Sequence, residues 1–356
     1  MNTLRASLRT HRALLLIVLL YAAAATVLAG SLPSPSDILN VLAGFLVAIL
    51  TGPVFILCGY TIRVMVVQRP HRLCHYLSPD LRRYLSNERL LHALPAMLLI
   101  PIFASSFTVF KAAIPRLHPY TWDATLSSWD MALHGGMAPW ERLQPLLGHP
   151  LVTALLNFSY HFWFFLFYAI LYWLILDTRR PLLRMQFLLS FALTWIALGS
   201  VLAVLFASVG PCYYGHLHAS DPYAPLMAYL HEANQHIPVW ALQVQDMLWQ
   251  GYQSKGVNGE LGISAMPSMH VATAVLMAMM GWRVSRATGT ALSIFAVLIM
   301  LGSIHLGWHY AVDGYVGAAG AVLVWRLVGR MLGREAAAPV AALAPVPCMS
   351  KGGVAS

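Results

Sequence analysis

Charged side chains are what this sequence has least of. Asp, Glu, Lys and Arg together make up 10% of its 356 residues, whereas hydrophobic residues make up 59%. Soluble domains usually carry about 25% charged residues, so the composition excludes an ordinary water-soluble globular protein. The mean hydropathy of +0.66 instead predicts a polytopic membrane protein. We expect an all-α membrane helix bundle, because a helix satisfies its own backbone hydrogen bonds in lipid.

Cysteine and acidic residues are also scarce, which narrows the possible cofactor chemistry. The four cysteines are scattered and predict neither a disulfide framework nor a zinc knuckle: Cys58, Cys74, Cys212 and Cys348. The 13 acidic residues form no cluster suited to Mg²⁺. The loop histidines follow no recognised zinc spacing: His216, His218, His231 and His236. We therefore expect no metal and no cofactor.

The formal net charge of +9 points to a membrane rather than to nucleic acid, because of where the cations lie. With the amino terminus in the cytoplasm, all but four of the 22 Lys and Arg residues fall on the cytoplasmic side. The exceptions are Lys111, Arg116, Arg142 and Lys255. This bias fixes the orientation of membrane helices. It predicts an integral membrane protein with no nucleic-acid partner.

Eight apolar runs are long enough to cross a bilayer, which takes about 20 residues. They are 13–30, 38–60, 91–110, 151–176, 185–208, 265–282, 290–308 and 310–332. We divide the chain into two N-terminal spans with a basic cytoplasmic link (1–90), a core of six spans (91–334) and a disordered tail rich in Ala and Pro (335–356). The alternative for the first run is a signal peptide, because small residues at 25–31 suit a cleavage site.

Two long loops, 112–150 and 209–264, are expected on the extracytoplasmic side. Aromatic and aliphatic residues recur at helical spacing from 122 to 133, with Asp123 and Asp130 on the neighbouring face. This pattern favours an amphipathic helix in the membrane interface, and a lid over the active site is the alternative. His161, in the fourth run, is either a buried histidine bonded to a neighbour or a residue that faces the substrate.

Ionisable residues gather at the ends of three apolar runs. The stretch Met266-Pro267-Ser268-Met269-His270 opens the sixth run, and the stretch from His305 to Asp313 joins the seventh to the eighth. Ionisable groups are costly in membrane helices, so each is a functional candidate. Two antiparallel helices return the chain to the same level of the membrane. We therefore expect the two stretches to meet at the extracytoplasmic side.

His309 and Asp313 are four residues apart, which places them on one face of a helix. A carboxylate there accepts the N–H of one ring nitrogen, fixes the tautomer and leaves the other nitrogen free to act as a nucleophile. His270 is the candidate acid and base on the opposite side, a role typically worth about 10²–10⁴-fold in rate. These three residues are the predicted catalytic group.

The start of the sixth run is a candidate anion site. Pro267 suits the first turn of a helix, so Ser268 and Met269 are expected to offer free backbone N–H groups to a phosphate. His305, Lys255 and tyrosine hydroxyls are the candidate additional contacts to the phosphate.

P-S-x-H followed by H-x-x-x-D resembles the second and third signatures of the phosphatidic acid phosphatase type 2 superfamily. The wording A-M-P-S-M-H and H-Y-A-V-D-G is most similar to the branch of inositol phosphorylceramide synthases and their bacterial relatives. The resemblance implies a six-helix core, His309 as the nucleophile with Asp313 as its partner, and His270 as the acid–base. It also implies phospholipid and lipid-alcohol substrates and a place in a bacterial inner membrane.

The sequence departs from the superfamily pattern in its charges. The first signature, K-x-x-x-x-x-x-R-P, is absent from 209–264, Met269 replaces a glycine, and Ser303 stands where an arginine is expected. A site with fewer cations suits a singly charged phosphodiester better than a monoester. This favours headgroup transfer between lipids over hydrolysis of phosphatidic acid or a polyprenyl pyrophosphate, which is the alternative. The same histidines also permit a proton relay in a transporter, or a zinc site with His270.

Overall fold

The computed structural model describes residues 2–30, 54, 57–62, 64–69, 86–254 and 262–337. In these parts of the chain every regular element is helical, which confirms the all-α fold class. Most of the predicted second span, Lys255 and the predicted tail beyond Ala337 lie outside the described residues.

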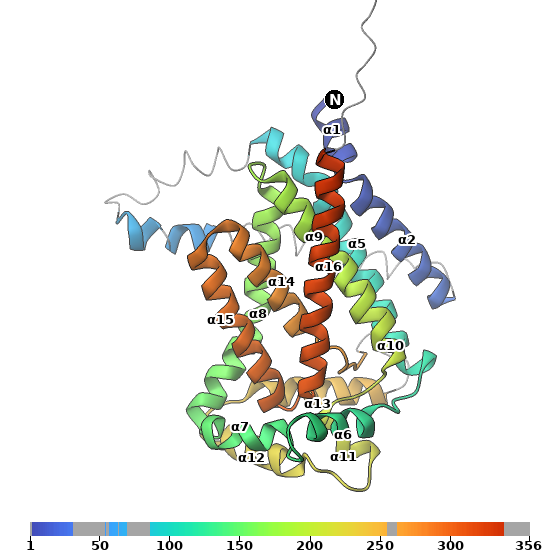
Figure 1. The fold of residues 1–356 in the computed structure, drawn as a ribbon, viewed down its shortest axis with the longest axis vertical. Coiled ribbons are helices and arrows are strands. Elements are labelled where there is room, and N and C mark those ends of the chain that lie inside the picture. Colours follow the sequence, from blue (N-terminus) through green and yellow to red (C-terminus); the bar gives the residue numbers. More distant parts are fainter. Residues whose placement is uncertain are drawn as a thin grey trace, which may run out of the picture.

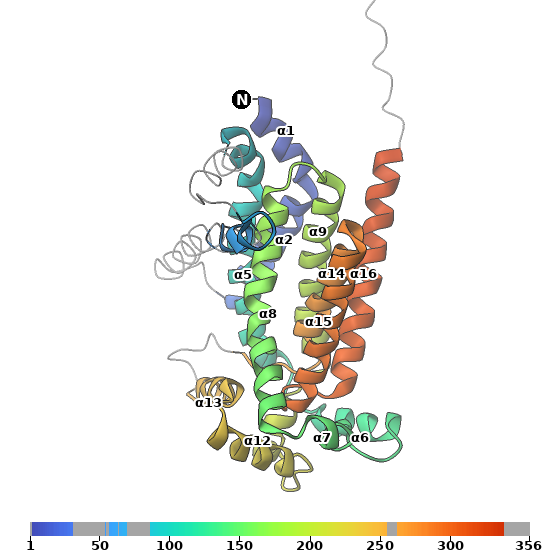
Figure 2. The ribbon, with the colours of Figure 1, turned by 90° about the vertical axis from the view of Figure 1, so that its left-hand side faces the viewer.

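Six of the described helices are long and apolar enough to cross a membrane, and they form one bundle (Figures 1 and 2). Each overlaps an apolar run found in the sequence, so the chain is an integral membrane protein. Their bounds are α2 (Arg12–Ala29), α5 (Asn87–Leu117), α8 (Pro150–Leu176), α9 (Pro181–Ile196) continued by a π-helical turn (Ala197–Leu202) and α10 (Ala203–Leu205), α15 (Arg286–His305) and α16 (Ala311–Ala337).

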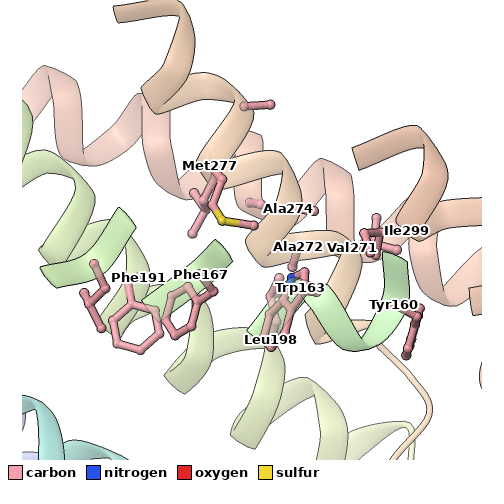
Figure 3. Packing of buried hydrophobic residues seen from close by; sticks show 14 of the residues in the cluster. Tyr160, Trp163, Phe167, Phe191, Leu198, Val271, Ala272, Ala274, Met277 and Ile299 are labelled. Atoms are coloured by element: carbon pink, nitrogen blue, oxygen red, sulfur yellow. The ribbon is translucent and has the colours of Figure 1, made fainter. Parts of the chain in front are cut away.

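A seventh apolar helix, α14 (Met269–Val284), is shorter than these and lies in the middle of the bundle. Small residues such as Ala272 and Ala274, both fully buried, let its backbone approach its neighbours closely. Aromatic side chains of α8 and α9 pack beside it, among them Trp163, Phe167 and Phe191 (Figure 3). The start of α14 is therefore held by tight packing on several sides.

Short helices cover one end of the bundle, and we call them the loop layer (Figure 2). They are α6 (Asp123–Leu133), α7 (Pro139–Leu147), a 3-10 turn (Pro211–Tyr213), α11 (Tyr214–Leu217), α12 (Ala224–His236) and α13 (Trp240–Gln253). The amide of Gln245 donates to the carbonyl of Leu306 at 2.9 Å, and the backbone N–H of Ala241 donates to Asn157 Oδ1 at 3.0 Å. Hydrogen bonds thus join the layer to the helices. The amino-terminal helix α1 (Asn2–Thr10) lies at the opposite end.

The π-helical turn lies beside the start of α14. A Cβ atom at Gly199 would lie 2.8 Å from the ring of Phe107 and 3.2 Å from the sulfur of Met269, so only glycine leaves room for both side chains. The next residue, Ser200, is 2.6 Å from the hydroxyl of Tyr21 on α2. The turn therefore holds α2 against the bundle and places Met269.

Candidate active site

His309 and Asp313 form a close pair at the start of α16. His309 Nδ1 lies 3.4 Å from Asp313 Oδ2, and Asp313 is fully buried. His309 precedes the helix rather than lying within it, because α16 begins at Ala311. Asp313 Oδ2 also accepts the backbone N–H of Tyr310 at 3.0 Å, which bends the segment back toward the carboxylate. The pairing expected from helical spacing is thus made by a cap at the helix start.

His270 lies in the first turn of α14 and faces His309. The centroids of the two imidazole rings are 6.5 Å apart. The two rings are therefore close enough to act on the same substrate group. Because Nδ1 of His309 faces Asp313, Nε2 is the nitrogen left for attack. The structure thus brings His270, His309 and Asp313 into one cluster.

The start of α14 provides backbone donors at this cluster. Ser268 caps the helix, since its hydroxyl accepts the N–H of Val271 at 3.4 Å. Its own N–H donates to the carbonyl of Asp313 at 3.0 Å, which ties the two motifs together. The N–H groups of Met269 and His270 belong to the first turn and have no acceptor within the helix. A helix start of this kind binds anions.

Aromatic residues of α8 enclose His270, and sequence reasoning missed them. The Tyr160 ring stacks on His270 at 4.4 Å between centroids, and the Trp163 ring lies at 4.5 Å. Both side chains are buried, and neither Tyr160 Oη nor Trp163 Nε1 has a hydrogen-bond partner among the residues that the structure describes. Two aromatic residues three positions apart on an apolar helix are typical of hydrophobic core packing. The sequence pattern therefore did not indicate that they lie beside His270.

Lys111 is the second residue that sequence reasoning missed. It lies near the end of α5, within electrostatic range of His270. A side chain at Gly262 would collide with the carbonyl of Lys111, so the segment that leads to His270 packs directly on this part of α5. Its position at the outer end of a predicted span was the available signal. A lysine there can supply positive charge to a phosphate at the α14 start.

His305 and Lys255 are the other residues predicted to contact the substrate, and the structure describes only His305. His305 is fully buried, and its Nε2 lies 2.9 Å from the hydroxyl of Thr153 at the start of α8. The Thr153 hydroxyl is in turn 2.7 Å from that of Tyr229 on α12. These contacts place His305 between α8 and α12, and its substrate role stays a prediction. Lys255 lies outside the described residues.

The remaining histidines make local contacts. His161 Nδ1 lies 2.8 Å from the carbonyl of Asn157 one turn earlier, and its ring meets Trp240 edge to face. In the loop layer, the His216 ring stacks on Trp249 at 4.3 Å and that of His218 lies 4.4 Å from Tyr214. Within the described ranges no group of three or more His, Cys, Asp or Glu side chains is arranged to hold a metal ion.

The fold and the cluster together define a class of protein. A bundle of membrane-spanning helices holds two opposed imidazoles, one backed by a buried carboxylate, beside the open start of a helix. Nucleophile, carboxylate partner and opposed acid–base are the groups that a phosphoryl-transfer reaction through a covalent intermediate needs.

Comparison with known families agrees with this class. A sequence model described as the PAP2 superfamily matches residues 124–327, which is more than half of the chain. The chain belongs to the PAP2 superfamily, and it is a membrane enzyme of the phosphatase and phosphotransferase type. No curated protein and no solved structure is significantly similar to it.

Proposed function

We propose that this protein is a membrane lipid phosphotransferase that works through a phosphohistidine on His309, similar in reaction to inositol phosphorylceramide synthase. The observation that carries the proposal is the 6.5 Å separation between the rings of His270 and His309, with Asp313 behind only one of them. That asymmetry gives the two histidines different roles.

In the first half-reaction, Nε2 of His309 attacks phosphorus and the bond from phosphorus to the leaving oxygen breaks. Asp313 stabilises the positive charge that develops on the His309 ring. His270 donates its proton to the leaving oxygen, so that an alcohol departs rather than an alkoxide. The products are the phosphohistidine and a lipid alcohol such as diacylglycerol.

In the second half-reaction the same groups act in reverse. His270, now neutral, removes the proton from the hydroxyl of the acceptor lipid. The acceptor oxygen attacks phosphorus, the bond from phosphorus to His309 Nε2 breaks, and both imidazoles return to their starting states. Each proton and bond in the two half-reactions is accounted for by His309, His270 and the two lipid alcohols.

The polar groups around the cluster favour a phosphodiester. Among the described residues, Lys111 is the Lys or Arg that acts electrostatically on His270, and Tyr160 Oη and Trp163 Nε1 are neutral donors without partners there. One cation and neutral donors balance a singly charged diester better than a doubly charged monoester. The donor we propose is therefore a glycerophospholipid such as phosphatidylinositol, and the acceptor is ceramide or another lipid alcohol.

We propose that the loop layer and the active site face the extracytoplasmic side of a bacterial inner membrane. The distribution of Lys and Arg in the sequence supports this orientation, because 18 of the 22 fall on the other side. Single cysteines introduced at Ser128 in the loop layer and at Arg5 near the amino terminus test it, in a variant whose four native cysteines are replaced by serine. An impermeant thiol reagent should label the first in intact cells and the second only after lysis, and the reverse pattern would contradict the orientation.

Product analysis with purified protein tests the reaction. A phospholipid labelled in its headgroup phosphate is incubated with and without ceramide, using His309→Gln as the inactive control. Label transferred to ceramide, with little soluble label in its absence, supports a transferase. Rapid release of soluble phosphate ester without acceptor would identify a phosphatase instead. Turnover without acid-labile phosphohistidine on the wild-type protein would refute the mechanism, and pH-driven transport without turnover would identify a transporter.

A further inference from the structure

Two buried aspartates on α6 connect the loop layer to the catalytic segments. Asp123 and Asp130 lie seven residues apart on one face of the helix and are 1% and 2% exposed. Burial raises the pKa of both carboxyl groups, and hydrogen bonds from backbone N–H groups oppose that rise. Buried carboxylates are costly unless they are well bonded, so a helix that only covered the bundle would be better served by apolar residues.

Asp130 caps the helix that carries Asp313. Its Oδ2 accepts the N–H of Ala311 at 2.7 Å, and its Oδ1 accepts the N–H of Val312 at 2.8 Å. These two residues form the first turn of α16, between His309 and Asp313 in the chain. Both oxygens of one carboxylate therefore fix the segment whose geometry sets the contact between His309 and Asp313.

Asp123 holds the same region from its other flank. It accepts the hydroxyl of Tyr310 at 2.8 Å and the backbone N–H groups of Val209 and Gly210 at 2.9–3.1 Å. Gly210 has φ +93°, and a Cβ there would lie 2.6 Å from the carbonyl oxygen of Trp308. The turn at Gly210 thus packs directly on the residue before His309. Asp123 and Asp130 together bind both sides of the catalytic histidine.

Asp130 also determines which helix start is open to an anion. The starts of α14 and α16 both lie at the cluster, and each would attract a phosphate through free N–H groups and its helix dipole. At α16 the carboxylate of Asp130 already occupies two of those N–H groups. Asp130 and His309 line the same small cavity, of about 10 Å³, which has room for one water molecule and none for a phosphate.

We propose that Asp130, supported by Asp123, is a positioning residue that fixes His309 against Asp313 and closes the α16 start, so that the substrate phosphate binds at the start of α14. The inference rests on the proposed function for its kinetic part. The closure of the α16 start is a binding property that can be measured without turnover.

Asp130→Asn and Asp130→Ala test both parts, with Asp246→Asn as the matched control. Asp246 is an exposed carboxylate on α13, in the same layer but outside these contacts. Asn retains one acceptor oxygen and Ala retains none. Because a displacement of about 1 Å at a reacting group costs about 100-fold, we expect kcat to fall about 10-fold in Asp130→Asn and about 100-fold in Asp130→Ala, with KM within about 3-fold of wild type. Asp246→Asn should match wild type.

Inorganic phosphate provides the second readout. In equilibrium dialysis with labelled phosphate, we expect wild type and Asp246→Asn to bind one phosphate, at the α14 start. Asp130→Ala, whose α16 start is also open, should bind a second phosphate, and added phosphate should raise its unfolding temperature more than that of wild type. If the substitution only loosened the packing of α16, the variant would lose activity without gaining a phosphate site. If Asp130→Ala does not fold, phosphate binding is measured on Asp130→Asn instead, because this variant loses the charge and one hydrogen bond.

The outcomes separate the two proposals. A wild type that transfers no phosphoryl group, together with an Asp130→Ala variant that gains phosphate binding, would overturn the proposed function and support the closure. An active wild type whose Asp130→Asn and Asp130→Ala variants keep full kcat, or gain no phosphate binding, would overturn the role of Asp130 and leave the proposed function intact.

Discussion

Replacing Asp313 by Asn removes one negative charge from the active site with little change in shape. The Asp313 oxygen that lies 3.4 Å from His309 Nδ1 also accepts the N–H of Tyr310. The amide oxygen of Asn can occupy the same position and keep both contacts. Any loss of activity is then caused by the missing negative charge and not by a change in the fold.

The expected loss follows from the distance. A unit negative charge 3.4 Å from a ring that becomes positive in the transition state stabilises it by about 5 kcal/mol at an effective dielectric constant of about 20. Each 1.36 kcal/mol is a factor of ten in rate. Part of that interaction already exists with the polarised neutral ring, so we expect kcat to fall by about 10²–10⁴-fold. KM should change little, because Asp313 faces Nδ1 of His309 and not the nitrogen proposed to attack.

Single-turnover formation of phosphohistidine from labelled phospholipid measures this step directly. The unfolding temperature of Asp313→Asn in the same detergent provides the control for folding. A variant that unfolds like wild type and keeps more than about one third of the wild-type rate would refute the charge role of Asp313. A rise in KM at constant kcat would show instead that Asp313 acts in substrate binding.

Further predictions concern the acid–base, the cation and the amino-terminal helices. In a single turnover, His270→Gln should slow phosphohistidine formation from a phospholipid by about 10²–10⁴-fold, but nitrophenolate release from a p-nitrophenyl phosphodiester by less than about 10-fold, because nitrophenolate leaves without a proton. Equal losses in this first half-reaction would contradict the acid role. Lys111→Met should raise KM by about 10-fold or more with kcat nearly constant, and an unchanged KM would remove Lys111 from the phosphate site. Tyr21→Phe should lower the free energy of unfolding by about 1 kcal/mol, since it removes the 2.6 Å contact to Ser200, and no change in calorimetry would mean that α2 is not held there. Burial lowers the pKa of His11 from 6.5 to about 4, so the unfolded chain binds the proton more tightly and the protein should lose stability as pH falls from 6.5 towards 4. His11→Phe should flatten that dependence in unfolding measurements, and an equally steep curve would contradict the assignment.

The sequence predicted the described membrane helices and the meeting of His270, His309 and Asp313, because both depend on patterns of single residues. Apolar runs of sufficient length indicate spans whatever they pack against. The spacing of His309 and Asp313 indicated their contact, although the structure makes it at a helix start rather than within a turn. The meeting of His270 with His309 followed from the antiparallel order of the spans.

The surroundings of the cluster could not be predicted in the same way. Asp130 bonds to backbone N–H groups 181 and 182 residues away, and no side-chain pattern encodes such a partner. The sequence placed Asp130 on the face of an interfacial helix, and nothing in that periodicity distinguishes a water-facing carboxylate from a buried cap. Tyr160 and Trp163 were hidden for the opposite reason, because aromatic residues are expected throughout an apolar helix.

The short length of α14 bears on the competition between alcohol and water as the final acceptor. Its 16 residues span about 24 Å, less than the roughly 30 Å of hydrocarbon in a bilayer. The end that carries His270 is enclosed by Tyr160 and Trp163, so in the proposed reaction these rings would keep water from the phosphohistidine. The lifetime of that intermediate against hydrolysis would then depend on how far one short helix reaches toward the membrane surface.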